Sequence, residues 1–229
     1  MKRLFDALGY TLLIVLFLGV AIFQAQADPA GVCWVADFSG GNLVKLSPDG
    51  AELLRLQNLD LPWRVAVDPN DGSCWVIDAY GKLIKYSVIG NELFRLTGLG
   101  GEDDISVNPN DGSCWVATGS QRQVVKISAA GVEQFRLGGF GGVYSIAVDP
   151  TDNSCWVGDE GKDELVKISA AGSILFTVSG FGFPEALAVN PNNGDCWIAD
   201  LGLKTVVKLR ADGSEIGRYP MNYPYSASV

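Results

Sequence analysis

The chain has 229 residues, of which 17 are Lys or Arg, 26 are Asp or Glu and none is His, so its formal net charge at pH 7 is −9. An acidic chain without a run of Lys or Arg repels phosphate backbones, which argues against nucleic acid as a partner. The lack of histidine excludes Ser-His-Asp and Cys-His catalytic arrangements and metal sites that need imidazole.

The first 27 residues have the layout of a secretory signal peptide. Lys2 and Arg3 supply positive charge, residues 10–23 form an apolar run, and residues 25–27 give a small-x-small cleavage pattern. The alternative is an uncleaved membrane anchor, but the apolar run is shorter than the about 20 residues that span a bilayer. We therefore expect a leader at residues 1–27 and one domain at residues 28–229. The protein would be secreted or periplasmic, with no membrane contact after cleavage.

A motif centred on Cys-Trp then recurs five times. Its fullest copy, at residues 68–78, reads Asp-Pro-Asn-Asp-Gly-Ser-Cys-Trp-Val-Ile-Asp, and the motifs follow one another at 40 or 41 residues. A fixed period of this length indicates a repeat architecture. The cysteines of the five copies are Cys33, Cys74, Cys114, Cys155 and Cys196.

Each repeat is predicted to hold four short strands. In the second, apolar and β-branched residues at 65–67 and 74–77 flank a Pro-Asn-Asp-Gly turn, and two further strands follow at 82–86 and 92–96. Four strands per repeat are the unit of a β-propeller blade, so the predicted class is an all-β propeller of antiparallel blades. The last two strands of the other repeats are expected at 43–46 and 52–56, 124–127 and 133–137, 165–168 and 174–178, and 206–209 and 215–219.

The cysteines and tryptophans of the motif each allow two interpretations. Exported proteins often carry disulfides, but equivalent points on neighbouring blades are too far apart for the about 5.5–6 Å Cα separation of a disulfide. We expect Cys to act as a small buried hydrophobe and the five Trp to pack between blades rather than to stack on a ligand. The Asp that closes four of the motifs (Asp37, Asp78, Asp159, Asp200) is expected to brace the following turn with its side chain.

The order of these elements resembles the NHL repeat, and residues 41–50, Gly-Asn-Leu-Val-Lys-Leu-Ser-Pro-Asp-Gly, match its centre. The resemblance covers residues 28–229 and implies a propeller, most often six-bladed in that family. It also implies a module that binds protein or nucleic acid or, less often, a lyase or lactonase. Fold is fixed by such a repeat far better than function.

The two ends of the repeat region suggest five blades. Residues 224–229 resemble the inner strand at 143–148, and the turn that should follow this strand is found at residue 28. We therefore predict a five-bladed propeller in which the C-terminal strand closes the first blade, which would pair strand edges that otherwise stay open. A six-bladed ring and a fragment of a longer array are the alternatives.

Candidate binding residues are the positions that vary while the frame repeats. In propellers such positions lie at the start of the innermost strand and in the loop after the Trp strand, on one common face. A mixed aromatic and polar rim suits a peptide, glycan or small polar ligand, although ordinary variable surface is the competing interpretation. The candidates are Trp63, Arg64, Tyr80, Asp103, Asp104, Arg122, Tyr144, Glu185 and Tyr225.

Two functional classes follow. The first is an exported, monomeric, non-catalytic module that binds a protein, peptide or glycan on the variable face without a cofactor. The second is a lactonase- or lyase-like enzyme with an oxygen-ligated metal such as Ca²⁺ at the channel mouth. The weak candidates for its ligands are Asp103, Asp104 and Glu185. Because the chain lacks histidine, on which lyases of this resemblance rely, the sequence favours the binding module.

Overall fold

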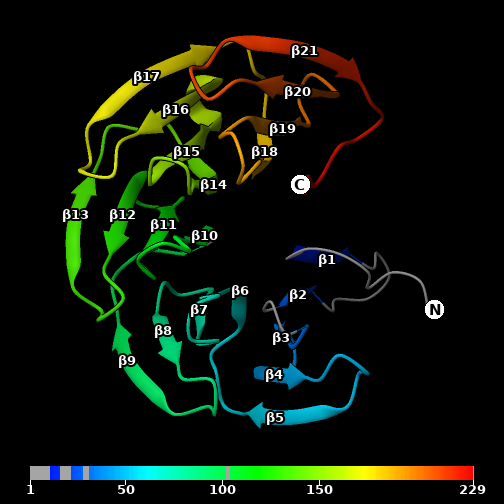
Figure 1. The fold of residues 1–229 in the computed structure, drawn as a ribbon, viewed down its shortest axis with the longest axis vertical. Helices are drawn as coiled ribbons and strands as arrows, with labels where there is room; N and C mark the ends of the chain where they lie inside the picture. Colours follow the sequence, from blue (N-terminus) through cyan, green and yellow to red (C-terminus); the bar gives the residue numbers. More distant parts are fainter. Residues whose placement is uncertain (1–10, 16–21, 28–30, 102–103, 229) are drawn as a thin grey trace. The chain divides into compact units, whose positions relative to one another are not determined.

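The computed structural model describes residues 11–15, 22–27, 31–101 and 104–228. They form antiparallel β-strands and one 3-10 turn, in two compact units, Met1–Gly98 and Leu99–Val229. The strands of each sheet follow one another in chain order, as in a meander (Figure 1).

Two sheets make up the first unit. One has five strands: β1 (Thr11–Val15), β2 (Ile22–Ala27), β3 (Cys33–Asp37), β4 (Asn42–Leu46) and β5 (Glu52–Leu56). The other has four: β6 (Pro62–Val67), β7 (Cys74–Asp78), β8 (Leu83–Tyr86) and β9 (Glu92–Leu96).

Three four-stranded sheets make up the second unit, and Figure 1 shows their first strands on one side and their last strands on the other. The first holds β10 (Asp104–Val107), β11 (Cys114–Thr118), β12 (Gln123–Ile127) and β13 (Glu133–Leu137). The second holds β14 (Val143–Asp149), β15 (Ser154–Asp159), β16 (Glu164–Ile168) and β17 (Ile174–Ser179), with the 3-10 turn η1 (Glu160–Lys162) between β15 and β16. The third holds β18 (Pro184–Val189), β19 (Cys196–Asp200), β20 (Thr205–Leu209) and β21 (Glu215–Pro220).

The predicted all-β class and the four strands of each repeat are confirmed, but closure by the C-terminus is not. Residues 221–228 form no strand. The edge of β3 that was predicted to receive them pairs instead with β2, in a register that joins Ala27 to Cys33 and Phe23 to Asp37. A strand taken from residues assigned to the leader thus fills the predicted place, and the first sheet has five strands. Cleavage of the leader stays a prediction, and among the described residues no helix is long and apolar enough to cross a membrane.

The Cys-Trp strand is the buried centre of each repeat, as predicted. Trp115 packs with Cys155, Val157 and Val166 of the next sheet in one core cluster, and Trp156 packs in the same way with Cys196. Trp197 lies in the last sheet along the chain and is only partly buried. This agrees with burial of each other Trp mainly by the sheet that follows its own in the chain. The rings of Trp75, Trp115 and Trp156 also meet an outer-strand Phe edge-on, at centroid distances of 5.1–5.5 Å.

A lysine on the strand after each Trp lies over the indole ring, and the Nζ atoms of Lys45, Lys126 and Lys167 also donate to a carbonyl of the next sheet. The Nζ atom of Lys167 lies 5.0 Å from the centroid of the Trp156 ring, 2.9 Å from Asp149 Oδ2 and 3.0 Å from the Ala211 carbonyl of the next sheet. Cation–π contacts and ion pairs are strong only where water is excluded, as it is here. The other members of the series over their Trp rings are Lys45, Lys85, Lys126 and Lys208.

All five cysteines are free thiols, and all but Cys33 are buried, so the packing interpretation is confirmed. Burial raises the pKa of the Cys74 and Cys155 thiols well above the ordinary value, and the thiolate is the reactive form. We expect thiol reagents to label almost no cysteine in the native protein and five in denaturant. Two stable disulfides in an intact-mass measurement would contradict this.

Candidate functional site

Several of the predicted rim residues lie on irregular strand starts. In β6, Pro62 pairs with Asp78 and Arg64 pairs with Ile77, so Trp63 has no partner in the ladder. The same one-residue bulge places Tyr144 at the start of β14 and Glu185 at the start of β18. Bulges turn a side chain away from the regular alternation and are common beside functional sites. Trp63, Tyr144 and Glu185, three of the predicted rim residues, therefore lie at bulge positions that have no partner in the strand ladder.

The Asp residues that end the Cys-Trp motifs accept hydrogen bonds from the backbone of the loops next to them. Asp78 Oδ1 accepts backbone hydrogen bonds from Tyr80 and Lys82 at 2.9 and 2.8 Å, which confirms the predicted turn brace. Asp200 likewise accepts a bond from Leu203 in its turn. Asp159 and Asp200 also accept bonds from amides ahead of the inner strand, Asp159 from Gly141 and Gly142 at 2.9 Å and Asp200 from Gly182 and Phe183.

The predicted rim residues do not all share one kind of environment. Trp63 meets Phe38 edge-on at 5.4 Å and lies 4.9 Å from the Arg64 guanidinium, so both residues are packed together. Tyr80 and Tyr225 are exposed. Arg122 is an exposed turn residue with a left-handed φ of 56°, and Asp103 lies outside the described residues.

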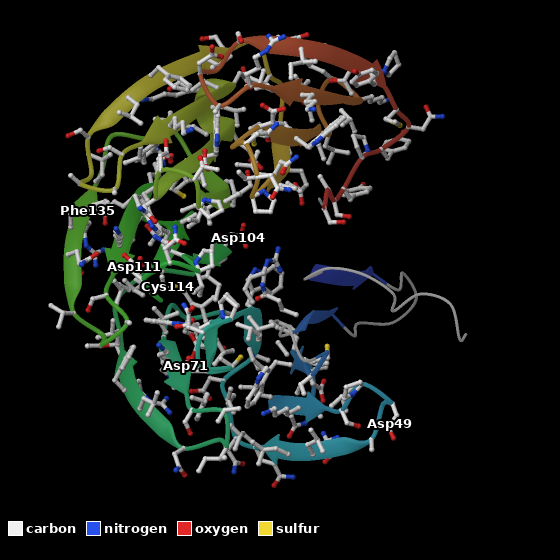
Figure 2. The ribbon with its side chains drawn as sticks, in the orientation of Figure 1. Asp49, Asp71, Asp104, Asp111, Cys114 and Phe135 are labelled. Carbon is white, nitrogen blue, oxygen red and sulfur yellow. The ribbon has the colours of Figure 1, made fainter. Side chains whose placement is uncertain are left out.

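Asp104 has a structural task. It lies on β10, at the opposite side of the sheet from Phe135 on β13 (Figure 2). Its Oδ2 accepts a hydrogen bond of 3.1 Å from the Ile146 amide on β14, and Ser106 Oγ accepts one from the Val148 amide. Side chains of one inner strand thus satisfy amides on the edge of the next, which would otherwise lack partners.

Glu160 and Glu185 are two glutamates of the second unit that influence each other, and the Glu160 carboxyl has a raised pKa. Glu160 opens the η1 turn after β15, and Glu185 stands at the bulge of β18 in the next sheet. Burial, the charge of Glu185 and the charge of Asp159 together raise the pKa of the Glu160 carboxyl to about 7. A carboxyl near pKa 7 can exchange a proton at neutral pH, and such groups cluster at functional sites.

The backbone around Glu160 is fixed by contacts that only small residues allow. Its amide donates to the Gly142 carbonyl at 2.8 Å. A Cβ on Gly161 would come within 2.4 Å of the Gly141 backbone, so both glycines are needed for the η1 turn to lie against this linker.

Glu185 is held from the other side. The buried Ser145 hydroxyl on β14 donates a 2.6 Å hydrogen bond to the Pro184 carbonyl, directly before Glu185. A Cβ on Gly158 would stand 2.8 Å from that same carbonyl, so the absence of a side chain lets β18 approach β15. The two glutamates are therefore positioned by the frame of two adjacent sheets.

Glu185 was among the predicted rim residues, whereas Glu160 was not. The motif ends at Asp159, and the residue after it differs in every repeat: Phe38, Ala79, Gly119, Glu160 and Leu201. A carboxylate directly after a buried carboxylate was the available signal. The sequence could not show that the charge of Glu185, on the next sheet, acts on Glu160.

The metal site stays a prediction, because Asp103, one of its three candidate ligands, lies outside the described residues. No group of three or more His, Cys, Asp or Glu side chains within the described part of the chain is placed to hold a metal ion. Asp104 Oδ2 accepts a hydrogen bond from the β14 backbone, and the charge of Glu185 acts on the Glu160 carboxyl.

No protein-family model matches the sequence, and a search of curated proteins finds no match. Solved structures do match. The chain is similar to virginiamycin B lyase from Staphylococcus aureus (TM-score 0.79, 14% identity, 93% of this chain and 76% of that chain). It is also similar to a streptogramin B lyase (TM-score 0.78, 13% identity, 93% and 74%). A third match is a Bacteroides caccae protein of unknown function (TM-score 0.65, 15% identity, 90% and 86%). At these identities the likeness establishes the β-propeller repeat fold alone; no match supports the NHL family by sequence.

The comparisons also correct the functional expectation. The sequence favoured a non-catalytic binding module, whereas the matched structures of known activity named above are lyases. The expectation of a non-catalytic module is therefore set aside in favour of the lyase-like alternative.

Proposed function

We propose that the chain is a lyase-like propeller enzyme in which Glu160 is the general base. The observation that carries the proposal is the pKa of the half-buried Glu160 carboxyl, which burial and the charge of Glu185, on the bulged start of β18, raise to about 7. The fold likeness to lyases supports the same reaction class. The NHL-type identity of the repeat, export by the leader and five-bladed closure stay proposals alongside it.

The base must differ from that of the matched enzyme. A virginiamycin B lyase variant with one histidine changed to alanine is described as catalytically inactive, and this chain contains no histidine. A carboxylate with a pKa near 7 can take the same kind of role, because the best catalytic pKa lies close to the working pH.

The proposed reaction is an elimination. Ionised Glu160 takes a proton from a carbon next to a carbonyl, the electron pair of that C–H bond forms a double bond to the adjacent carbon, and the bond from that adjacent carbon to the leaving oxygen breaks. Glu160 can then return the proton to the departing oxygen, so no external reactant is consumed. The neighbouring Glu185 keeps the proton affinity of Glu160 high through the repulsion of two like charges.

The test compares Glu160→Gln with Glu133→Gln, a control on the outer strand β13. Substrates are quinupristin, the compound in one of the matched lyase structures, and small esters whose ester oxygen is bonded to the carbon next to an acidic C–H. We expect kcat/KM of the parent to rise with pH and level off above about 7. Glu160→Gln should lose at least about 100-fold, and the control should match the parent. No turnover of any substrate, or equal turnover by Glu160→Gln, would refute the proposal.

A stability measurement checks the proton affinity itself. The folded-state pKa of Glu160 lies above its ordinary value of 4.5, so the folded protein holds a proton that the unfolded chain releases. This contribution to stability is present below pH 4.5 and is lost as the pH rises through about 7. Glu160→Gln should therefore gain stability relative to the parent between pH 5 and pH 8, by about 1 kcal/mol once solvent screening of this half-buried group is allowed for.

A further inference from the structure

A polar cavity of about 710 Å³ opens on the loops of the first unit. Its walls come from the β3–β4 turn, the β5–β6 linker and the β7–β8 turn. None of these residues belongs to the carboxylate pair of the proposed enzyme, so the inference below does not depend on that function.

Hydrogen bonds show which residues of the different linkers are equivalent. The Leu59 amide donates to the Gly41 carbonyl as the Phe181 amide donates to the Asp163 carbonyl. One step on, the Ala79 amide donates to the Leu61 carbonyl as the Glu160 amide donates to the Gly142 carbonyl. Counting from these bonds, Asp60 corresponds to Gly141 and Gly182, and Tyr80 corresponds to Gly161 and Gly202.

In two linkers of the other unit these equivalent positions are pairs of glycines in close contact, and in a third they are Gly100 and Ser120. A Cβ on Gly161 would come within 2.4 Å of the Gly141 backbone, and a Cβ on Gly202 would come within 2.7 Å of Gly182. Asp60 and Tyr80 could not pack in that way, because real Cβ atoms do not approach so closely. The replacement of a Gly–Gly contact by Asp and Tyr explains why a cavity exists at this linker.

The other substitutions in this linker add polar groups while they keep the backbone. Asn58 has φ 64°, where the equivalent Gly139 and Gly180 have φ 96° and 97°. Asn is among the few side chains that accept the left-handed region. In the facing turn the trend is reversed, since Gly41 stands where other turns carry Arg122 or Asp163 at similar φ. Side chains are added on one wall and removed from the other.

The resulting walls suit a neutral, hydroxyl-rich ring. Tyr80 is 66% exposed and offers a flat apolar face with a polar tip. The Gln57 and Asn58 side chains supply amides that both donate and accept, as sugar hydroxyls require. Asp60 forms an ion pair with Lys82, so the cavity edge carries paired charges rather than a field for an anion or a cation.

We propose that this cavity binds a sugar ring, which stacks on Tyr80 and whose hydroxyls bond to the Gln57 and Asn58 amides and the Asp60 carboxylate. The ring could be a free saccharide or the end of a glycan on another protein, since the recognised chemistry is the same. A single ring in an open site should bind weakly, with Kd on the order of 1 mM.

The full chain is tested by saturation-transfer NMR with the methyl glycosides of glucose, galactose and N-acetylglucosamine. We expect transfer to at least one of them, with strongest transfer to the ring protons. Tyr80→Ala should lose at least 10-fold in affinity and Tyr80→Phe should keep most of it, because stacking needs the ring. Asn58→Gly, which restores the residue of the other linkers and suits the observed φ, should lose several-fold without loss of stability.

Tyr223→Ala is the matched control, because it removes a similarly exposed tyrosine that does not line the cavity. It should bind like the parent. Comparison of the free glycoside with a glycopeptide bearing the same terminal sugar distinguishes the two sources. Absence of transfer to every glycoside, or transfer that survives both Tyr80→Ala and Asn58→Gly, would overturn the proposal.

Discussion

Asp149→Ala should lower the free energy of unfolding by about 3 kcal/mol, the lower end of the range for breaking a buried ion pair from one side. Asp149 is fully buried at the end of β14, and its Oδ2 lies 2.9 Å from the equally buried Lys167 Nζ. Removal of the carboxylate leaves an ammonium group with no close counter-charge inside the protein. Asp152, 3.5 Å from Nζ and half exposed, offsets only part of the loss.

A double-mutant cycle isolates this effect from the loss of the turn. Asp149 Oδ1 also accepts bonds from the Thr151 amide and hydroxyl, so part of the cost of Asp149→Ala belongs to the turn. Lys167→Met removes the charge and keeps an apolar stem beside Trp156. The double variant should be more stable than Asp149→Ala alone, as measured by urea denaturation. Glu133→Ala breaks an exposed pair with Arg136 and should cost no more than about 1 kcal/mol. Equal losses at the buried and exposed pairs would contradict the argument.

The repeat could be predicted from the sequence because its signals are local. Turn residues, apolar alternation and the 41-residue period each point to the same strands, and the described strands agree. The function of the motif Asp also followed from local turn chemistry at Asp78. Such features need no knowledge of how one repeat meets the next.

Features that arise between repeats escaped prediction. The lysine after each Trp looked like an ordinary strand residue, yet it lies over the ring, and Lys167 also bonds to the following sheet. The raised pKa of Glu160 depends on burial in the folded chain and on the charge of Glu185, which is 25 positions further along the chain. The pairing of β2 with β3 was missed because residues 22–27 were assigned to a leader on their composition.

The buried tryptophans have an unusual feature at their ring nitrogens. A buried indole N–H usually has a partner, but among the described residues the Nε1 atoms of Trp34, Trp75, Trp115 and Trp156 are buried without one. The lysine above the ring faces the π system rather than the N–H. The ring contributes to stability through packing and the cation–π contact, and the N–H subtracts from it.

Trp115→Ala should therefore lower the free energy of unfolding by about 3–5 kcal/mol, as expected for a large aromatic removed from a packed core. The ring is fully buried and packs against Cys155 and Val166 of the next sheet. It also meets Phe135 edge-on at 5.3 Å and carries Lys126 5.2 Å from its centroid. Loss of the ring leaves a cavity between two sheets and a buried ammonium group without its aromatic partner.

Trp115→Phe separates the ring from its unpaired N–H. Phenylalanine keeps an aromatic face for Lys126 and removes the polar atom that has no partner. Trp115→Phe should therefore lower the free energy of unfolding much less than Trp115→Ala does. Trp63→Ala, at a half-buried rim position, is the control for removal of a Trp outside the repeat frame and should also cost less than Trp115→Ala. Denaturant unfolding followed by far-ultraviolet circular dichroism gives all three values on one scale. A Trp115→Ala variant as stable as the parent would mean that this ring does not stabilise the packing between sheets. The same role inferred for Trp156 would then also be wrong.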